Sequence, residues 1–220
     1  GAALQILGNY GLYKTGNKEA TDLHPELSLL LTTSGSTGSR SLVRLSGRNI
    51  SANTEQIIDY LAIEPSDRAI TTMPMSYSYG LSIINSHLVQ GASLIANEHS
   101  LVSPDFWALI RAVDATTFGG VPFIYDMLKK LRFNRMDLPS LRYITQAGGK
   151  LSPELVRYFA DLCQKKDIDF FVMYGQTEAT ARMTYVPPTC IADKPASVGI
   201  AIPGAEIWLE DDSGHALTSE

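Results

Sequence analysis

From residue 69 onwards, short apolar segments alternate with segments of helix length, and this alternation is the strongest constraint on the fold. Short apolar runs bounded by Gly or Pro are typical of strands, whereas apolar residues at helical spacing are typical of helices. The predicted strands are 27–32, 69–73, 93–96, 115–118, 141–145, 169–173 and 205–210. The predicted helices are 50–61, 80–90, 105–113, 123–131 and 153–165. Strands that alternate with helices form βαβ units, so we predict an α/β fold with a mostly parallel sheet and helices on both faces.

Two of these helices have recognisable capping residues. Ser46 and Asn49 precede the predicted helix 50–61, and their side chains can accept hydrogen bonds from free backbone N–H groups. Ser103 followed by Pro104 gives the same signal before the predicted helix 105–113. We therefore expect these two helices to begin next to those residues.

Length and composition restrict the class of protein. A chain of 220 residues fits one domain of ordinary size, and 45% hydrophobic with 19% charged residues is typical of a globular fold. No segment of the sequence is both long and apolar enough to cross a bilayer. The net charge of −5, without a stripe of Lys and Arg, argues against a nucleic-acid-binding surface. We predict that residues 1–26 form a lead-in tail or part of a preceding segment, and that residues 27–220 form the α/β unit.

The cysteines and histidines do not suggest a metal centre. Cys163 and Cys190 lie in unrelated contexts without a CxxC spacing, so we expect one core thiol on a helix and one loop thiol. The four histidines share no spacing with Cys or Asp, and neither Ser34 nor Ser36 lies in the GxSxG motif of serine hydrolases. No leader of charged and then apolar residues begins the sequence, so a cytoplasmic location is expected.

The predicted strand 27–32 runs directly into a segment of glycine and small hydroxyl-bearing residues. These residues are Thr33, Ser34, Gly35, Ser36, Thr37 and Gly38. Glycine lets the backbone approach a ligand, and hydroxyl and N–H donors can surround an anion, so we interpret the segment as a phosphate-binding loop that follows a buried strand. From composition alone, a flexible surface connection is the alternative. Neither the GxxxxGK[ST] loop nor the GxGxxG fingerprint is present.

A second polar cluster, Tyr174-Gly175-Gln176-Thr177-Glu178, follows the predicted strand 169–173. It offers an aromatic face for a base, a glycine for close approach, a hydroxyl donor and a carboxylate that suits Mg²⁺. A turn with a solvated Glu178 is the alternative. Ligands of open parallel sheets bind beyond the carboxyl ends of the strands, so we expect this cluster, the first loop and Gly148-Gly149 to converge on one edge.

The two clusters carry a family resemblance. The segment TTSGSTGSRSLVRLS resembles the phosphate loop of the AMP-forming adenylate synthetases, T-S-G-[ST]-T-G-x-P-K-G, and residues 174–178 are similar to the Y-G-x-T-E motif of that family. The superfamily includes acyl-CoA synthetases, luciferases and peptide-synthetase adenylation domains. Arg40 and Ser41 stand where Pro and Lys usually are. The loss of that Lys removes a charge partner of the pyrophosphate leaving group, and Arg40 and Arg44 are the candidate substitutes.

The resemblance implies a role for each matching residue. Tyr174 is implied to pack on adenine, Thr177 to contact the α-phosphate and Glu178 to hold magnesium, which makes Thr177 and Glu178 the catalytic candidates. The nucleotide-binding candidates are Thr33, Ser34, Gly35, Ser36, Thr37, Gly38, Gly148, Gly149, Lys150, Tyr174, Gly175, Gln176 and Thr177.

Weaker matches concern the substrate side. The segment Pro74 to Gly80 is similar to the family's P-[LM]-x-H-x-x-G, with Tyr77 in place of a His that lies near the activated carboxylate. A Tyr can hydrogen-bond but is a poor cation at neutral pH. Residues 119–122 and 147–152 resemble the acyl-pocket and adenine-pocket stretches. The substrate-binding candidates are Tyr77, Tyr79, Gly80, Gly120 and Val121, with wall packing as the alternative for Tyr79.

For a complete enzyme, the resemblance implies attack of a carboxylate on the α-phosphate of ATP, release of pyrophosphate and transfer of the acyl group to a thiol, with Mg²⁺ as the metal. Coenzyme A is the preferred acceptor, and the absence of Asp from residues 75–78 favours an acid without an amino group. A carrier-protein-loading acyl or aryl ligase and a non-catalytic nucleotide-binding or interaction module are the alternatives. Family members are longer at both ends, so we expect a central fragment, one subdomain of the N-terminal domain, that adenylates poorly or not at all by itself.

Overall fold

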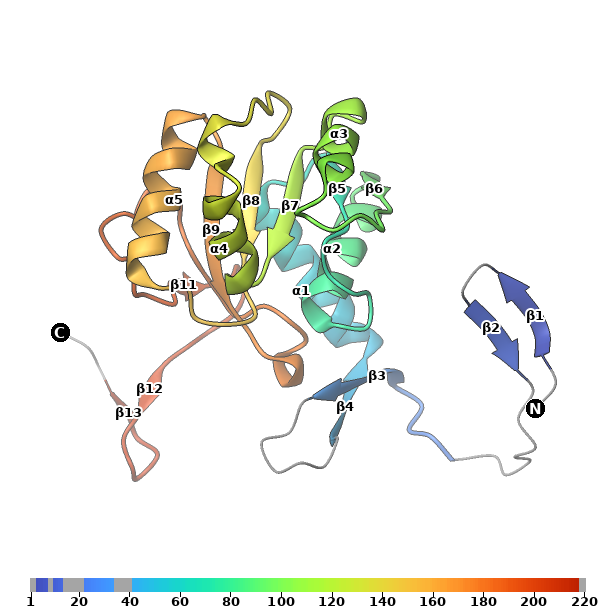
Figure 1. Cartoon of the computed structure of the whole chain (residues 1–220). Coiled ribbons are helices and arrows are strands. Elements are labelled where there is room, and N and C mark those ends of the chain that lie inside the picture. The colour runs from blue at the N-terminus through green and yellow to red at the C-terminus, as the bar shows by residue number, and fades with distance from the viewer. Residues whose placement is uncertain (1–2, 8–9, 14–21, 34–40, 218–220) are drawn as a thin grey trace.

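The computed structural model describes residues 3–7, 10–13, 22–33 and 41–217. Its centre is a seven-stranded sheet with the strand order β11-β10-β9-β8-β7-β5-β6 (Figure 1). The parallel strands are β5 (Arg68–Ile70), β6 (Ser93–Ile95), β7 (Thr117–Gly120), β8 (Tyr143–Gln146) and β9 (Asp169–Tyr174). Two short strands, β10 (Thr184–Val186) and β11 (Ile200–Ala201), extend the sheet antiparallel from β9. The predicted α/β fold with a mostly parallel sheet is confirmed.

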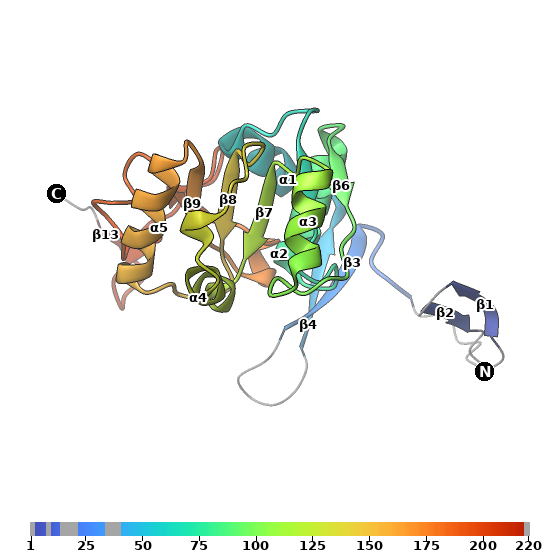
Figure 2. The same ribbon diagram turned by 45° about the horizontal axis from the view of Figure 1, so that its top comes forward.

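In the described part of the chain, five α-helices cover both faces of this sheet, as predicted. They are α1 (Gly47–Leu61), α2 (Ser78–Val89), α3 (Pro104–Ala112), α4 (Pro122–Lys130) and α5 (Pro153–Lys165). Figure 2 shows α3, α4 and α5 in front of the strands and α1 and α2 behind them. The central strands β7 and β8 are buried at every position, as expected for strands covered on both faces.

The two faces have separate cores because successive strand residues point to opposite sides. Along β8, for example, Tyr143 packs toward α1 and α2, and Ile144 packs toward α3, α4 and α5. The α3–α5 core includes Phe106, Phe118, Leu128, Phe133, Phe159 and Phe170. The α1–α2 core includes Ile57, Leu61, Tyr79, Ile83, Tyr143 and Phe171.

The capping predictions are confirmed. Ser46 is the N-cap of α1: its Oγ accepts a hydrogen bond from the Asn49 backbone N at 3.1 Å, and Asn49 Oδ1 accepts one from the Ser46 backbone N at 3.2 Å. This reciprocal capping box satisfies two N–H groups and starts the helix three residues before the predicted position. Ser103 caps α3, and Pro104 is its first residue.

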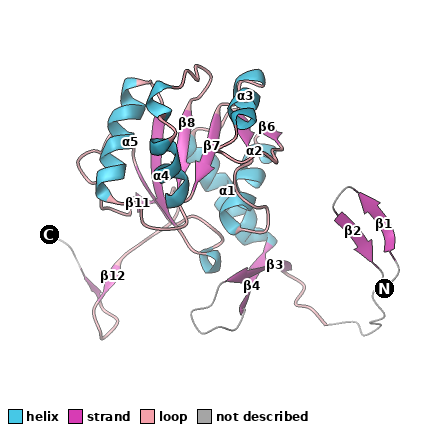
Figure 3. Ribbon diagram, in the orientation of Figure 1, coloured by secondary structure: helices cyan, strands magenta, loops and turns pink. Residues whose placement is uncertain are grey.

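The interpretation of residues 27–32 as a buried strand of the main sheet is wrong. These residues lie in β3 (Leu27–Thr33), which pairs antiparallel with β4 (Ser41–Ser46) in a separate hairpin (Figure 3). Only Leu31 of β3 is buried, because neighbouring side chains alternate between α1 and solvent. The apolar run concealed this alternation, since Leu30 is an exposed leucine.

The predicted strand 205–210 is also corrected. Only Leu209–Glu210 forms a strand, β12, and it pairs with β13 (Ala216–Leu217) outside the main sheet. In the turn between them, Asp211 Oδ1 accepts hydrogen bonds from the backbone N of Ser213 and of His215, both at 2.9 Å. In the segment predicted as a tail, β1 (Ala3–Leu7) and β2 (Tyr10–Tyr13) form another hairpin.

The thiol predictions are confirmed: Cys163 of α5 is buried, Cys190 is exposed in a loop, and both are free. Burial raises the pKa of Cys163 to about 12, so this thiol stays protonated at neutral pH. Across the described segments, no helix combines the length and apolar character that a membrane span requires.

Candidate functional site

Two of the three predicted clusters, Gly148-Gly149 and residues 174–178, meet where the parallel strands β8 and β9 end. A sheet-edge cavity of about 390 Å³ lies at this edge. Its lining residues come from three segments: Gln146 at the end of β8 with residues 148–151, residues 172–175 at the end of β9, and residues 195–198. A smaller inner hollow of about 80 Å³ lies beside it and is lined by Tyr77, Ser78, Tyr79, Ala147, Gly148, Tyr174, Gly175, Gln176, Thr177, Ala181 and Arg182. Because Gly148, Tyr174 and Gly175 line both spaces, the two are adjacent. This is the edge at which an open parallel sheet binds ligands.

Gly148 lets three predicted site residues come together. Its φ is +78°, and a Cβ at this position would lie 2.5 Å from Tyr77 Oη and 3.0 Å from Val121 Cγ1. Any side chain would be both strained and in collision with Tyr77. A Cβ on the neighbouring Gly149 would lie 3.1 Å from Pro122 Cγ. The two glycines thus bring the end of β8 into contact with the loop before α2 and the start of α4.

Gly175 has a similar function on β9. A Cβ at Gly175 would collide with the backbone carbonyl of Ala181, because the chain turns back immediately beside it. The Met183 backbone N donates to the Tyr174 carbonyl at 2.9 Å and closes this turn. The turn contains the short 3₁₀ helix η2 (Thr177–Ala179). Only glycine allows residues 174–183 to fold this closely.

The side chains of the second cluster have defined positions and partners. Thr177 Oγ1 lies 3.2 Å from Ser78 Oγ at the first turn of α2, so its hydroxyl has a defined position. The Tyr174 ring is 42% exposed, which leaves an aromatic face accessible. Gln176 Nε2 donates to Tyr174 Oη at 3.2 Å. Glu178 is exposed and forms no ion pair with any other described residue.

The first loop is only partly described. Thr33 ends β3 and pairs with Ser41 at the start of β4, while Ser34, Gly35, Ser36, Thr37, Gly38 and Arg40 lie outside the described residues. β4 lies against η2, so the hairpin packs on the turn that carries Thr177 and Glu178. Of the two candidate replacements for the missing Lys, Arg44 is described; it lies in β4 and is exposed.

Three predicted substrate residues have clear packing contacts. Tyr79 is buried, and its Oη lies 2.7 Å from Thr145 Oγ1 and 2.9 Å from the Thr145 carbonyl. Burial raises the pKa of Tyr79 to about 12. A Cβ at Gly80 would collide with the Pro74 carbonyl, and one at Gly120 would lie 2.7 Å from Ile124 Cγ2. Tyr77 is half-buried and lines the inner hollow, and burial raises its pKa above the ordinary value.

Arg182 is a buried cation that sequence reasoning missed. Arg182 is only 3% exposed. No carboxylate of the described residues lies within 4.0 Å of its guanidinium nitrogens. Nε donates to Ser82 Oγ at 3.2 Å, and Nη1 donates to Tyr60 Oη at 2.9 Å. The guanidinium carbon lies 5.3 Å from the centre of the Tyr79 ring. No spacing or motif marked this arginine, because its partners come from distant elements of the chain.

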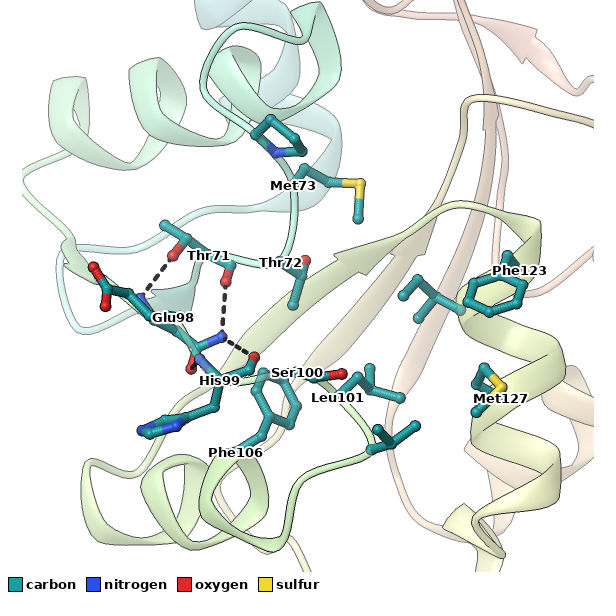
Figure 4. A pocket seen from close by; sticks show the side chains of 14 residues that line it. Thr71, Thr72, Met73, Glu98, His99, Ser100, Leu101, Phe106, Phe123 and Met127 are labelled. Carbon is teal, nitrogen blue, oxygen red and sulfur yellow. Dashed lines mark hydrogen bonds between the residues drawn. The ribbon is translucent and has the colours of Figure 1, made fainter. Parts of the chain in front are cut away.

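A side cavity of about 480 Å³ lies on the other side of the β5–α2 connection. Figure 4 shows Thr71, Glu98 and His99 on one side of this cavity, with Phe123 and Met127 of α4 across from them. Asn97 orders the polar wall: its backbone N donates to Thr71 Oγ1 at 3.0 Å and its Nδ2 donates to the His99 carbonyl at 2.9 Å. Residues 72–74 line this cavity and residues 77–79 line the inner hollow, so one short segment separates them.

Carboxylates, histidines and thiols do not gather into a metal-binding group in the described residues. Within the ranges that the structure describes, no group of three or more His, Cys, Asp or Glu side chains could hold a metal ion by itself. Mg²⁺ bound together with a nucleotide needs only one or two protein carboxylates, since phosphates and water supply the other oxygens. Glu178 is exposed and follows Thr177, which lines the inner hollow, so it fits that requirement.

The chain is similar in sequence and fold to known proteins. A sequence profile described as AMP-binding enzyme matches residues 7–219. A probable CoA ligase from Humulus lupulus is 26% identical over 203 residues, which are 90% of this chain and 38% of that protein. The chain therefore spans well under half the length of this curated relative.

Two solved structures share the fold. The inhibitor-bound N-terminal domain of FACL13 from Mycobacterium tuberculosis has a TM-score of 0.79 at 20% identity, covering 91% of this chain and 50% of that chain. O-succinylbenzoate coenzyme A synthetase from Bacillus subtilis, in complex with AMP, has a TM-score of 0.75 at 25% identity, covering 86% of this chain and 38% of that chain.

Proposed function

Because this chain belongs to the AMP-binding enzyme family, we propose that the protein activates a carboxylic acid with ATP and transfers the acyl group to coenzyme A. In the first step a carboxylate oxygen forms a bond to the α-phosphorus of ATP, and the bond from that phosphorus to the bridging oxygen breaks. Pyrophosphate leaves with the electron pair, and an acyl-adenylate remains. In the second step a thiol attacks the acyl carbon, its proton is released, and AMP leaves.

One observation supports this proposal most strongly. Tyr174, Gly175 and Gly148 line two adjacent spaces at the carboxyl ends of the strands, and Thr177 faces the smaller one. In this arrangement adenine occupies the sheet-edge cavity against Tyr174, with Gly149 and Lys150 on the opposite side. The α-phosphate then lies near Thr177, whose hydroxyl is oriented by Ser78.

The residues around the reacting atoms have electrostatic rather than covalent tasks. Negative charge develops on the phosphates during the displacement, and donors that are already oriented stabilise it without reorganisation. Thr177 supplies one such donor, and Ser34 to Gly38 are proposed to supply others. Mg²⁺ held by Glu178 would neutralise phosphate charge when bound. Tyr77 is proposed to contact the acid, as a neutral hydrogen-bond donor.

The acceptor is proposed to be coenzyme A because the curated relative described above is named a CoA ligase. A carrier protein is the alternative acceptor, and it would leave the first step unchanged. The exposed Ser41 at the position of the usual Lys favours a second candidate function, a nucleotide-binding module without catalysis. Pyrophosphate exchange dependent on a carboxylic acid distinguishes the ligase from that module.

The test of the nucleotide site is calorimetric titration of this chain with AMP, and with ATP plus Mg²⁺. We expect saturable binding of both, weakened about tenfold by Thr177→Ala, because a hydrogen bond to a charged group is lost. Glu178→Gln should weaken binding of ATP with Mg²⁺ and leave AMP binding unchanged. The matched controls are Thr189→Ala and Glu55→Gln, which change exposed residues elsewhere. Equal binding by all four variants would contradict the proposed roles of Thr177 and Glu178.

A further inference from the structure

Arg182 is the most unusual charged group in the described part of the molecule. A buried arginine normally has a carboxylate partner, because removing an ion from water costs several kcal/mol that neutral neighbours offset only in part. The acceptors around Arg182 are Ser82 Oγ, Tyr60 Oη and, at 3.5 Å, Met173 Sδ, and all are neutral. The protein therefore retains a buried positive charge without a counter-ion among the described residues.

The guanidinium also has unused donors. Arginine carries five N–H groups in a planar fork. Hydrogen bonds to described residues involve only Nε and Nη1 of Arg182, so the two N–H groups of Nη2 have no acceptor among those residues. Nη2 is not one of the sealed, unpartnered atoms of the described residues, so a ligand oxygen can reach it and accept a charge-assisted hydrogen bond.

Arg182 lies where a substrate could reach it. It lines the same inner hollow as Thr177 and Tyr77. The volume of about 80 Å³ accommodates on the order of five water-sized groups. An acid whose reacting carboxylate lies beside Thr177 would therefore extend toward Arg182, and only a short acid would fit.

We propose that Arg182 binds a second anionic group of the acid, so that the enzyme's substrate is a short dicarboxylic acid. This inference rests on the proposed function, since it assumes that the inner hollow holds the acid to be activated. One carboxylate reacts with ATP near Thr177, and the distal carboxylate accepts hydrogen bonds from Nη2 of Arg182. Acids that end in a methyl group would leave the cation unpaired and are rejected for that reason.

The fixed position of Arg182 suits it to such selection. The Asn53 side chain forms hydrogen bonds with both backbone polar groups of Arg182. Its Nδ2 donates to the Arg182 carbonyl at 2.9 Å, and its Oδ1 accepts from the Arg182 backbone N at 3.4 Å. Ser82 and Tyr60 hold the side chain from α2 and α1. A bound anion would therefore not have to order the arginine, and a pre-organised donor gives more discrimination than a flexible one.

The test compares succinate with butyrate, which has the same number of carbons but a methyl group in place of the distal carboxylate. Both acids are titrated across the millimolar range into this chain, in the presence of AMP, and binding is followed by protein NMR chemical shifts. We expect succinate to bind at least about tenfold more tightly than butyrate. Equal affinity, or binding of neither acid, would overturn the proposal.

Variants of Arg182 test whether its positive charge causes the preference for succinate. Arg182→Met should abolish the preference for succinate, and Arg182→Lys should retain part of it. If Arg182→Met does not fold, Tyr60→Phe provides the second comparison, because it removes one neutral acceptor and keeps the charge; it should lower stability but preserve the preference. Loss of the preference in Tyr60→Phe would contradict a charge-based selection.

The AMP titration separates this inference from the proposed function. Binding of AMP without a preference for succinate would refute the dicarboxylate inference alone. A preference for succinate without AMP binding would support the anion subsite and refute the nucleotide site in this chain.

Discussion

The two cores that flank the sheet differ in chemistry although the same strands form both. The α3–α5 core consists of aromatic and aliphatic side chains, with Phe159 in contact with the rings of Tyr125, Tyr158 and Phe170. The α1–α2 core contains hydrogen-bonded polar side chains. One group, the polar network, joins Asn53, Tyr60 and Ser82 to Arg182, and a separate group joins Ser86, His87 and Tyr143. The polar network lies next to the inner hollow, and the aromatic core does not reach it. The difference indicates that the polar face positions the inner hollow, whereas the aromatic face mainly stabilises the fold.

Among the tests of this difference between the cores, Phe159→Ala is expected to cause the largest loss of unfolding free energy. The ring is fully buried, so its loss removes transfer free energy and leaves a cavity, at a cost of about 3–5 kcal/mol in unfolding free energy. Urea denaturation measures this cost. Phe123→Ala is the control, because Phe123 is 66% exposed and its loss should cost under about 0.5 kcal/mol. At a temperature where Phe159→Ala is folded, its AMP affinity should be that of the parent chain, and a lower affinity would contradict the division between the cores.

Asn53→Ala probes the polar network. It leaves the backbone N–H and carbonyl of Arg182 without their buried partners, and should cost about 1–3 kcal/mol. Unlike Phe159→Ala, it should also weaken the preference for succinate, since it releases the backbone that holds Arg182. A stability loss without any change in acid binding would mean that the network supports the fold only.

Removing a helix cap should lower the unfolding free energy by a similar amount on either face of the sheet. Ser46 caps α1 on one face, and Ser152 caps α5 on the other, accepting a hydrogen bond from the Leu155 backbone N at 3.3 Å. Ser46→Ala and Ser152→Ala should each cost about 1 kcal/mol by chemical denaturation, because each exposes the same kind of unpaired N–H group. Unequal losses beyond the experimental error would show that the faces also differ in local helix stability.

The smallest change is expected in the pH dependence of stability, through His87. Burial lowers the pKa of His87, whose Nε2 lies 3.1 Å from Tyr143 Oη and whose Nδ1 lies 2.7 Å from the Ile83 carbonyl. Ser86 and the charges of Asp67 and Arg182 also face this ring. Between the lowered pKa and the ordinary value of about 6.5, the unfolded chain binds more protons than the folded one. The contribution of neutral His87 to the free energy of unfolding is therefore fully present above that range, and it is lost as the pH decreases through it.

Urea midpoints at about pH 7.5 and about pH 5.5 measure this effect. In His87→Gln the difference between the two midpoints should shrink. Asp67 does not interfere, because hydrogen bonds from Arg142 hold the pKa of Asp67 below its ordinary value against the effect of burial. Its contribution is lost only at more acidic pH. An undiminished difference in His87→Gln would assign the pH dependence to other groups.

The parts of the fold that sequence reasoning predicted are those fixed by local patterns. The capping box at Ser46 and Asn49 and the alternation of strands with helices each follow from neighbouring residues. The short strands β10 and β11 were missed because two or three residues carry no periodic signal. The hairpin β3–β4 was misread because the apolar run of Leu29, Leu30 and Leu31 looked buried on both faces.

The site was predictable only in part, for a related reason. The glycines and Thr177 lie in contiguous motifs, so their convergence followed from strand order. Arg182 depends on Asn53, which is 129 positions away in the chain, and on Ser82, which is 100 positions away. Such a network is defined by tertiary contacts alone, and a single sequence does not record it. The roles of the site residues stay predictions until the titrations are made.

Because Gly175 packs closely against the Ala181 carbonyl, the binding of one substrate should affect the affinity for the other. Gly175 follows the tyrosine proposed to hold adenine, and Ala181 precedes the arginine proposed to hold the acid. No free space separates these two backbones, so a displacement on either side has to be accommodated on the other. Coupling of this kind is reciprocal: whatever factor one ligand contributes to the affinity of the second, the second contributes to the affinity of the first.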